Sequence, residues 1–241
     1  MKKAFIFIIL FAVGHCFAQD AQGGEDVGWI ARFGAAGGFT PSIVFPNLDP
    51  INAEIKNLGI GQFSNSAIVT YGGGGYIYIM MIDNLRVGGM GVGGSKSTSG
   101  FVGGFNNQVN YKYGFGGLTI EYTLPFIKKT AVSAGAIIGA GSASIEFYQN
   151  KNNITWDNSW LGNSGNSSHT YTNNFFTITP TLNADIPLSR FIAIRIGGGY
   201  VFSFNNDWKI DNNQSISNVP SNLKSNSFFI QTGIYLGFFA Y

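Results

Sequence analysis

Five charged residues lie in segments that otherwise carry few charges, and they are the first candidates for chemistry. They are Arg32, Arg86, Glu121, Asp185 and Arg195. Each lies within a few residues of a predicted short turn, on the side of the chain that also carries Gly, Ser and Thr. A buried charge is costly when isolated and less costly when paired. We therefore predict a structural ion network in the lumen of a barrel, with a proton or ion path as the alternative role.

His169 is a second candidate, because it is the only histidine after the first twenty residues. Ser164, Ser167 and Ser168 are close to it in sequence, and a hydrolase needs a base beside its nucleophile. A polar segment rich in Asn and Ser is a poor rigid support for such a base. We expect no enzymatic activity, with a lipid-modifying enzyme as an alternative.

No cofactor and no metal site is predicted. Asp157, Asp207 and Asp211 could offer oxygen ligands to calcium, but they lack the spacing of a calcium loop. The glycine run at residues 72–75 lacks the Lys-Ser/Thr signature and the following helix of a phosphate-binding loop. Glycines that relieve crowding inside a narrow barrel are the better interpretation.

The elements that position these residues are predicted from alternating apolar and polar side chains, which is the period of a strand. Ile178 and Leu182, for example, alternate with polar residues such as Thr179. The pattern resumes after a tight turn at residues 187–190. Eight strands are expected, at about residues 28–40, 67–80, 85–95, 109–124, 130–148, 176–186, 192–204 and 227–241.

The connections between these strands alternate between long and short, so that both chain ends lie on the short-turn side. The first long connection is expected to contain a short amphipathic helix, capped by Asp49 and stopped by Gly59. The predicted fold class is all-β, an eight-stranded antiparallel up-and-down transmembrane β-barrel with short periplasmic turns and long extracellular loops. A soluble, exported lipocalin-like barrel has the same alternation with its apolar face inward, and is the alternative fold.

Composition supports the membrane interpretation. Charged residues make up 11% of the 241-residue chain, against about 25% in ordinary soluble domains. Lys2 and Lys3, an apolar run and small residues before Gln19 indicate a signal peptide at residues 1–18, followed by a flexible leader at 19–27 and the barrel domain at 28–241. Cleavage removes Cys16, the sole cysteine, and leaves equal numbers of basic and acidic residues, so no basic surface for nucleic acid is expected.

The C-terminal segment resembles the assembly signal of bacterial outer-membrane barrels, in which a polar residue, a glycine and spaced aromatics end on an aromatic. The residues that carry this resemblance are Gln231, Gly233, Leu236, Phe238 and Tyr241. Tyr241 shares its parity with Gln231, so a bulge or register change near Gly237 is expected to turn it outward. With the signal peptide and the loop lengths, the whole mature chain is similar to the small barrels of the OmpA, OmpX and OmpW type.

The resemblance implies a bacterial outer-membrane location with both termini in the periplasm. The expected partners are outer-membrane lipids, the barrel-assembly machinery and an extracellular ligand bound through the loops. The expected function is non-enzymatic, with a filled, Gly-rich lumen and surface loops in structural or binding roles. The filled lumen is expected because an eight-stranded barrel is just wide enough for side chains to fill it. A narrow channel for small solutes is the main alternative.

Overall fold

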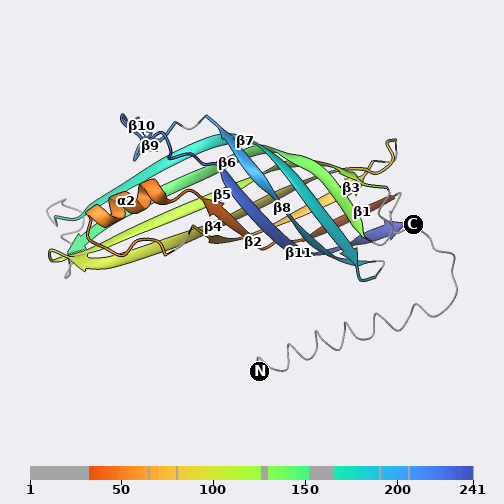
Figure 1. Cartoon of the computed structure of the whole chain (residues 1–241), viewed down its shortest axis with the longest axis horizontal. Coiled ribbons are helices and arrows are strands. Elements are labelled where there is room, and N and C mark those ends of the chain that lie inside the picture. Colours follow the sequence, from red (N-terminus) through yellow and green to blue (C-terminus); the bar gives the residue numbers. More distant parts are fainter. Residues whose placement is uncertain are drawn as a thin grey trace, which may run out of the picture.

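The computed structural model describes residues 33–64, 66–79, 81–125, 130–151, 165–189, 191–205 and 207–240. It is a long barrel of tilted strands (Figure 1). The elements are β1 (Phe33–Phe39), β2 (Ser42–Pro46), α2 (Asp49–Asn57), β3 (Ile68–Tyr78), β4 (Leu85–Val102), β5 (Phe105–Thr123), β6 (Ala131–Lys151), β7 (Ser167–Pro187), β8 (Ile192–Phe204), β9 (Lys209–Ile210), β10 (Gln214–Ser215) and β11 (Ser227–Ala240).

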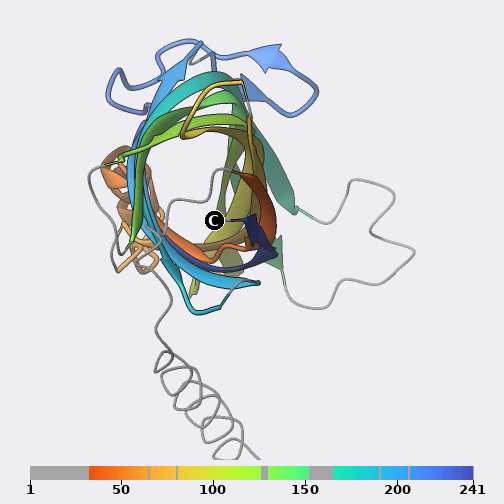
Figure 2. The same cartoon turned by 90° about the vertical axis from the view of Figure 1, so that its right-hand side faces the viewer.

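Within the described residues, eight antiparallel strands close into a ring, which Figure 2 shows from the end that carries the C-terminus. Strand β1 pairs with β11 on one side and with β3 on the other, so no edge is left open there. Strands β3 to β8 follow in chain order, and β8 pairs with β11. Closure satisfies the backbone hydrogen bonds that a bilayer cannot satisfy.

The first strand of the ring is interrupted at Thr40 and Pro41 and continues as β2. Pro41 has no N–H to donate, so it cannot take part in a regular ladder. Its carbonyl still accepts a hydrogen bond from the Thr232 amide (3.1 Å), and β2 pairs with the same two neighbours, β11 and β3. The interruption therefore bends the strand without opening the ring.

The two faces of the ring differ in the direction predicted for a membrane protein. Large apolar side chains point outward, as with Phe176 at 69% and Leu182 at 59% exposure. Their neighbours Thr179 and Asn183 point inward and are buried. A soluble barrel would need charged residues on that outer surface, so the lipocalin-like alternative is rejected. The fold is an eight-stranded antiparallel transmembrane β-barrel.

Strands β4 to β7 are longer than the sequence indicated. The long connection expected between the predicted strands 85–95 and 109–124 is a tight hairpin instead. Gly103 and Gly104 take φ values of 61° and 84°, which the two central residues of such a turn require. Strand β7 likewise starts at Ser167, within the segment expected to be a loop. The last long connection contains the small β9–β10 hairpin.

Helix α2 lies over the ends of the long strands that are remote from the C-terminus (Figure 1). Its buried residues Ile51 and Ile55 follow the predicted stripe, and the chain leaves the helix at Gly59 with φ of 73°. Asp49 is the first helical residue, however, and Leu48 holds the N-cap position that was predicted for it. In the part of the chain that is described, no helix is long and apolar enough to cross a membrane.

The interior has two regions. An apolar cluster lies in the half remote from the C-terminus and joins α2 to inward side chains of the barrel, among them Tyr113, Phe115, Phe175 and Phe229. The half with the short turns holds the buried charged side chains together with a smaller cluster of Ala36, Tyr76, Tyr78, Ala193 and Tyr235. The candidate site lies in the half with the short turns, where the buried charges are.

Candidate functional site

Four of the five predicted charges meet inside the barrel. Arg86 on β4 faces Glu121 on β5 in the strand register, and Asp185 on β7 faces Arg195 on β8. Each register pair is an ion pair, with Arg86 Nη2 at 2.8 Å from Glu121 Oε2 and Arg195 Nε at 2.6 Å from Asp185 Oδ1. The short turns that follow β3, β5 and β7 hold these residues at one level. We call these four residues the lumen ion network.

The two register pairs are also joined across the lumen. Arg86 Nη1 lies 2.5 Å from Asp185 Oδ2, and Arg195 Nη1 lies 3.4 Å from Glu121 Oε1. Each arginine therefore contacts both carboxylates. Glu121 and Asp185 share both arginines, because the closed barrel brings strands β4 and β7 within reach of a guanidinium group even though they are not neighbours.

All four side chains are 6% exposed or less, and two positive charges balance two negative ones. Removing such charges from water costs several kcal/mol per ion, which only close pairing and further hydrogen bonds offset. Charge-assisted bonds with two-point contact are the strongest available here, and Arg195 makes one to Asp185 through Nε and Nη2 (2.6 and 3.0 Å).

Neutral side chains add further hydrogen bonds to the charges. Asn183 Nδ2 donates to Glu121 Oε1 (2.9 Å), and Gln231 Nε2 donates to Asn183 Oδ1 (2.7 Å). Arg86 also donates to the Ser133 hydroxyl. Among the described residues, Arg86 Nε is one of the few buried side-chain atoms with no hydrogen-bond partner. The network therefore extends from β4 round to β11 through polar contacts.

Two tyrosines lie against the guanidinium groups. Tyr76 lies under both arginines, with its ring centroid 4.4 Å from Arg86 Cζ and 4.7 Å from Arg195 Cζ. Tyr235 lies 4.6 Å from Arg195 Cζ, and the two tyrosine rings stack. Cation–π contacts of this kind are stronger when the cation is desolvated. Sequence reasoning missed both tyrosines, although Tyr76 has the parity of inward residues and pairs with Gly88, two residues from Arg86 on the same face of β4.

The remaining predicted site residues are placed as follows. Arg32 and Tyr241 lie outside the described residues. Gln231 is buried and points inward, whereas Leu236 and Phe238 are exposed on the outer face. The predicted bulge near Gly237 is absent, since the β1–β11 register runs without interruption from Phe39↔Ile234 to Phe33↔Ala240.

The segments considered for catalysis and for ligand binding have other roles in the fold. His169 lies in strand β7 and not in a loop, and its Nδ1 is 3.0 Å from Asp211 Oδ2. The His169 hydrogen bond, with a second one from the Thr170 amide, lowers the pKa of Asp211. No group of three metal-ligating side chains occurs among the described residues. In the glycine run on β3, a Cβ on Gly72 would lie 1.9 Å from the Gly91 carbonyl oxygen, so close strand packing requires glycine there.

Comparisons with known proteins give structural likeness only. No protein-family model and no curated protein matches the chain. Solved structures similar to it include Ail of Yersinia pestis (11% identity, 86% of this chain and 97% of that chain covered, TM-score 0.42), crystallised with the heparin analogue sucrose octasulfate. Others are OprG of Pseudomonas aeruginosa (12%, 86% and 96%, TM-score 0.44) and a major outer membrane protein of Thermus thermophilus (9%, 84% and 99%, TM-score 0.42). These similarities are too low to transfer a function.

Proposed function

We propose that this protein is a non-enzymatic β-barrel of the bacterial outer membrane whose lumen is closed to solutes. The end of the barrel remote from the C-terminus, where strands β4 to β7 extend, then has a structural or binding role. The observation that carries this proposal is the two-region interior. The lumen ion network and its two tyrosines occupy the short-turn half, and inward aromatic side chains with α2 occupy the other half. A path for a solute would have to cross both.

The orientation belongs to the same proposal. The N-terminal signal sequence supports export, and the short turns lie at the end where β1 begins and β11 ends. In barrels of this kind short turns face the periplasm and long loops face outward. Both termini are then periplasmic, and the β4–β5 and β6–β7 hairpins extend outside the cell, where rigidly supported segments can bind an extracellular ligand.

Planar-bilayer conductance tests the closed lumen. The purified protein, reconstituted beside an open porin as positive control, should give no stepwise current at neutral pH. The double variant Tyr113→Ala, Phe115→Ala should remain closed as well, because it leaves the lumen ion network in place. Discrete current steps from the unmodified protein would contradict the proposal.

A narrow channel is the second candidate, and one observation favours it. Thr40 Oγ1, Thr181 Oγ1 and Gln231 Oε1 are buried and lack partners among the described residues. Buried polar atoms are usually satisfied, and ordered water is one way to satisfy them. If a chain of water molecules passes these three atoms, reconstituted vesicles should shrink faster under osmotic shock than protein-free vesicles. Thr181→Val should then slow that shrinkage.

Lipid modification at His169 is the third candidate. The His169–Asp211 pair resembles a base held by a carboxylate, but both side chains are more than 40% exposed. A catalytic pair is normally held by surrounding packing. Phospholipid incubated with the protein and with a His169→Ala variant should be unchanged in both samples. Turnover that is lost in the variant would establish the enzyme instead.

A further inference from the structure

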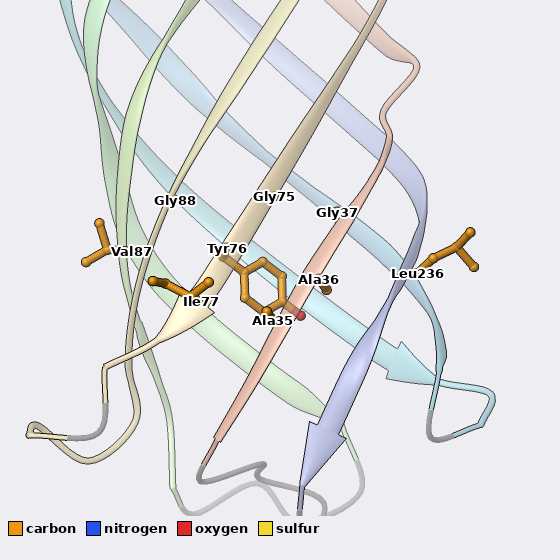
Figure 3. A pocket seen from close by; sticks show the side chains of 9 residues that line it. All are labelled: Ala35, Ala36, Gly37, Gly75, Tyr76, Ile77, Val87, Gly88 and Leu236. Carbon is orange, nitrogen blue, oxygen red and sulfur yellow. The ribbon is translucent and has the colours of Figure 1, made fainter.

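The outward side chains of the barrel change character along the long strands. Near the short turns they are apolar, and Ile77, Val87 and Leu236 point away from the barrel in Figure 3. This apolar band continues as far as Leu118 and Phe176. Beyond it, β4, β5 and β6 run on toward the end remote from the C-terminus (Figure 1), and most of their outward positions there carry hydroxyl and amide side chains. The outer surface therefore has an apolar part and a polar part.

The polar part is centred on two register rows that cross β4, β5 and β6. The rows consist of Ser97, Asn110 and Glu146 in the first and of Ser99, Gln108 and Tyr148 in the second. We call these six residues the polar sheet face. The two serines and Gln108 are exposed, and the other three residues are half-buried. The buried side chains of Val109 and Tyr111 lie on the opposite side of β5, against the apolar cluster.

The polar sheet face lies beyond the lipid headgroups. On β5, Gln108 is ten positions from Leu118, the last large apolar outward residue of that strand. At about 3.3 Å per residue and a strand tilt of about 45°, this corresponds to roughly 23 Å along the barrel axis. The headgroup layer of one leaflet is only about 5–8 Å thick. In the proposed orientation the face therefore stands in the medium outside the cell.

Hydrogen bonds along the polar sheet face hold its amide groups in place. Gln108 Nε2 donates to Asn110 Oδ1 (2.8 Å), and Asn110 Nδ2 donates to Glu146 Oε2 (3.3 Å). Lys112 forms an ion pair with Glu146, and the Tyr148 hydroxyl donates to the same carboxylate. A side-chain amide has two donor hydrogens and an acceptor oxygen, so each of these bonds uses only part of its capacity. The face therefore presents donors and acceptors that are already ordered, which lowers the cost of binding.

We infer that the polar sheet face binds an uncharged stretch of a polysaccharide chain, an inference that rests on the proposed outer-membrane orientation. Sugar hydroxyls both donate and accept hydrogen bonds, as do the amide and hydroxyl side chains of the face. Tyr148 adds a flat apolar surface for the C–H side of a sugar ring, next to these polar groups. Serine, asparagine and tyrosine are also the residues that combine adaptable hydrogen bonding with contact area in binding surfaces.

Charge and composition argue against other partners. Lys112 and Glu146 neutralise each other, so the face offers no net positive charge to a nucleic acid or a sulfated polymer. A protein interface is anchored by a cluster of aromatic, apolar or arginine side chains. The two rows of the face contain a single aromatic side chain, that of Tyr148. A hydroxyl-rich, neutral partner is the one that this surface matches.

The direction of the polar sheet face selects the source of the polysaccharide. Its side chains point sideways from strands that rise out of the membrane, and not toward the hairpin turn at Gly103 and Gly104 (Figure 1). A sugar chain that is anchored in the same leaflet and projects from it runs alongside these strands. A glycan on another cell would meet the hairpin turns first. The occupant is therefore the sugar part of a glycolipid in the same outer leaflet.

The test measures binding of the purified protein in detergent to polysaccharide that mild acid releases from the outer membrane of the cells that make the protein. Titration calorimetry should show saturable binding, and Tyr148→Ala and Gln108→Ala should each weaken it several-fold. Tyr122→Ala is the matched control and should keep the affinity, because Tyr122 is an exposed, outward tyrosine near the short turns. Unfolding midpoints report whether each variant is folded. In the unmodified protein, the side-chain amide NMR signals of Gln108 and Asn110 should shift when the polysaccharide is added.

Four results would overturn the inference. No saturable binding of the released polysaccharide means that the face does not recognise it. Binding of the intact glycolipid alone means that its lipid or phosphate groups are recognised instead. Equal affinity of Tyr148→Ala and Tyr122→Ala, with unshifted amide signals, places the site elsewhere. Tighter binding of dextran sulfate than of the released polysaccharide means that charge decides. None of these results bears on the closed membrane barrel, which the conductance experiment tests separately.

Discussion

Asp185 and Arg195 face each other as direct register partners across the β7–β8 hairpin, and two charge-assisted hydrogen bonds of 2.6 and 3.0 Å join them inside the barrel. Asp185 also accepts a bond from Arg86 on the far side of the lumen. This one carboxylate therefore contacts both buried guanidinium groups. Its removal should affect the whole lumen ion network and not one pair alone.

Asp185→Asn should lower the free energy of unfolding by about 3–5 kcal/mol, because it leaves buried positive charge uncompensated. Asp185→Asn combined with Arg195→Met should cost less than the single change, since Arg86 then remains paired with Glu121. Urea unfolding in lipid vesicles, followed by tryptophan fluorescence, measures all members of the double-mutant cycle. Additive effects of the two changes would mean that the residues are not coupled.

Ile194→Arg should destabilise the barrel because its side chain points toward lipid, opposite in parity to the buried Arg195. The cost should reach about 2–4 kcal/mol if Ile194 lies near the bilayer midplane and less if it lies near an interface. Ile194→Leu is the control and should be close to neutral. Folding yield into vesicles gives the comparison, and a harmless Arg variant in a membrane-inserted protein would overturn the assignment of this face.

Gly141→Ala should cost about 1–3 kcal/mol through overpacking. A Cβ at this position would lie 2.4 Å from Phe175 Cζ and 2.7 Å from the Gly114 carbonyl oxygen, so the ring and the backbone would both have to move. Gly91→Ala, where the nearest atom is 4.0 Å away, should be tolerated. The test compares the thermal unfolding midpoints of the two variants in one detergent. Equal midpoints would show that the aromatic cluster can rearrange to accept the added methyl group.

An epitope inserted at Gly165 should be labelled by antibody on intact cells. Gly165 has a φ of 66° and precedes β7 at the end of the long strands, so an insertion there does not interrupt a ladder. An insertion in the short turn at Asp83 is the control and should be labelled only in permeabilised cells. The reverse pattern would invert the proposed orientation.

The carboxyl pKa of Asp211 should lie below its ordinary value, and His169→Ala should raise it, because hydrogen bonds from His169 and the Thr170 amide favour the carboxylate. A depressed folded-state pKa stabilises the native state above the unfolded-state pKa. That contribution is lost as pH falls through the folded-state value, so acid and not alkali should loosen the β7–β9 contact. Carbon-detected NMR titration in detergent measures the shift, and no change in His169→Ala would show that the bond is not formed.

Much of the barrel was predictable because side-chain direction in a strand has a period of two. The polar face also carries too few charges to be an outer surface in water, so the apolar face is the one that meets lipid. Ile178 and Thr179 alone define the two faces of β7. The Asp185–Arg195 pair also follows from a short turn, since a tight β7–β8 connection places Arg195 opposite Asp185. These are local properties of the chain.

What the sequence did not predict depends on closure of the ring and on tertiary cover. The Arg86–Asp185 contact joins strands that are not neighbours, so alternation carries no sign of it. The extension of β4 through Thr98 and Gly100 is also non-local, because the segment after α2 packs there, with Ile60 against Gly100 and the Thr98 hydroxyl donating to the Gly61 carbonyl. Polar and glycine-rich composition resembles a loop until that cover is known.

The pairing of β1 with β11 has a consequence for biogenesis. The two strands are the first and the last that the structure describes, so the contacts that seal the ring have the greatest sequence separation among the described strand pairs and form slowly. Until the final 14-residue strand arrives, the edges of β1 and β8 remain unpaired and can template association with other chains. A chain that is cut short before Ser227 should accumulate as aggregate and be degraded, because the edges of β1 and β8 then stay unpaired.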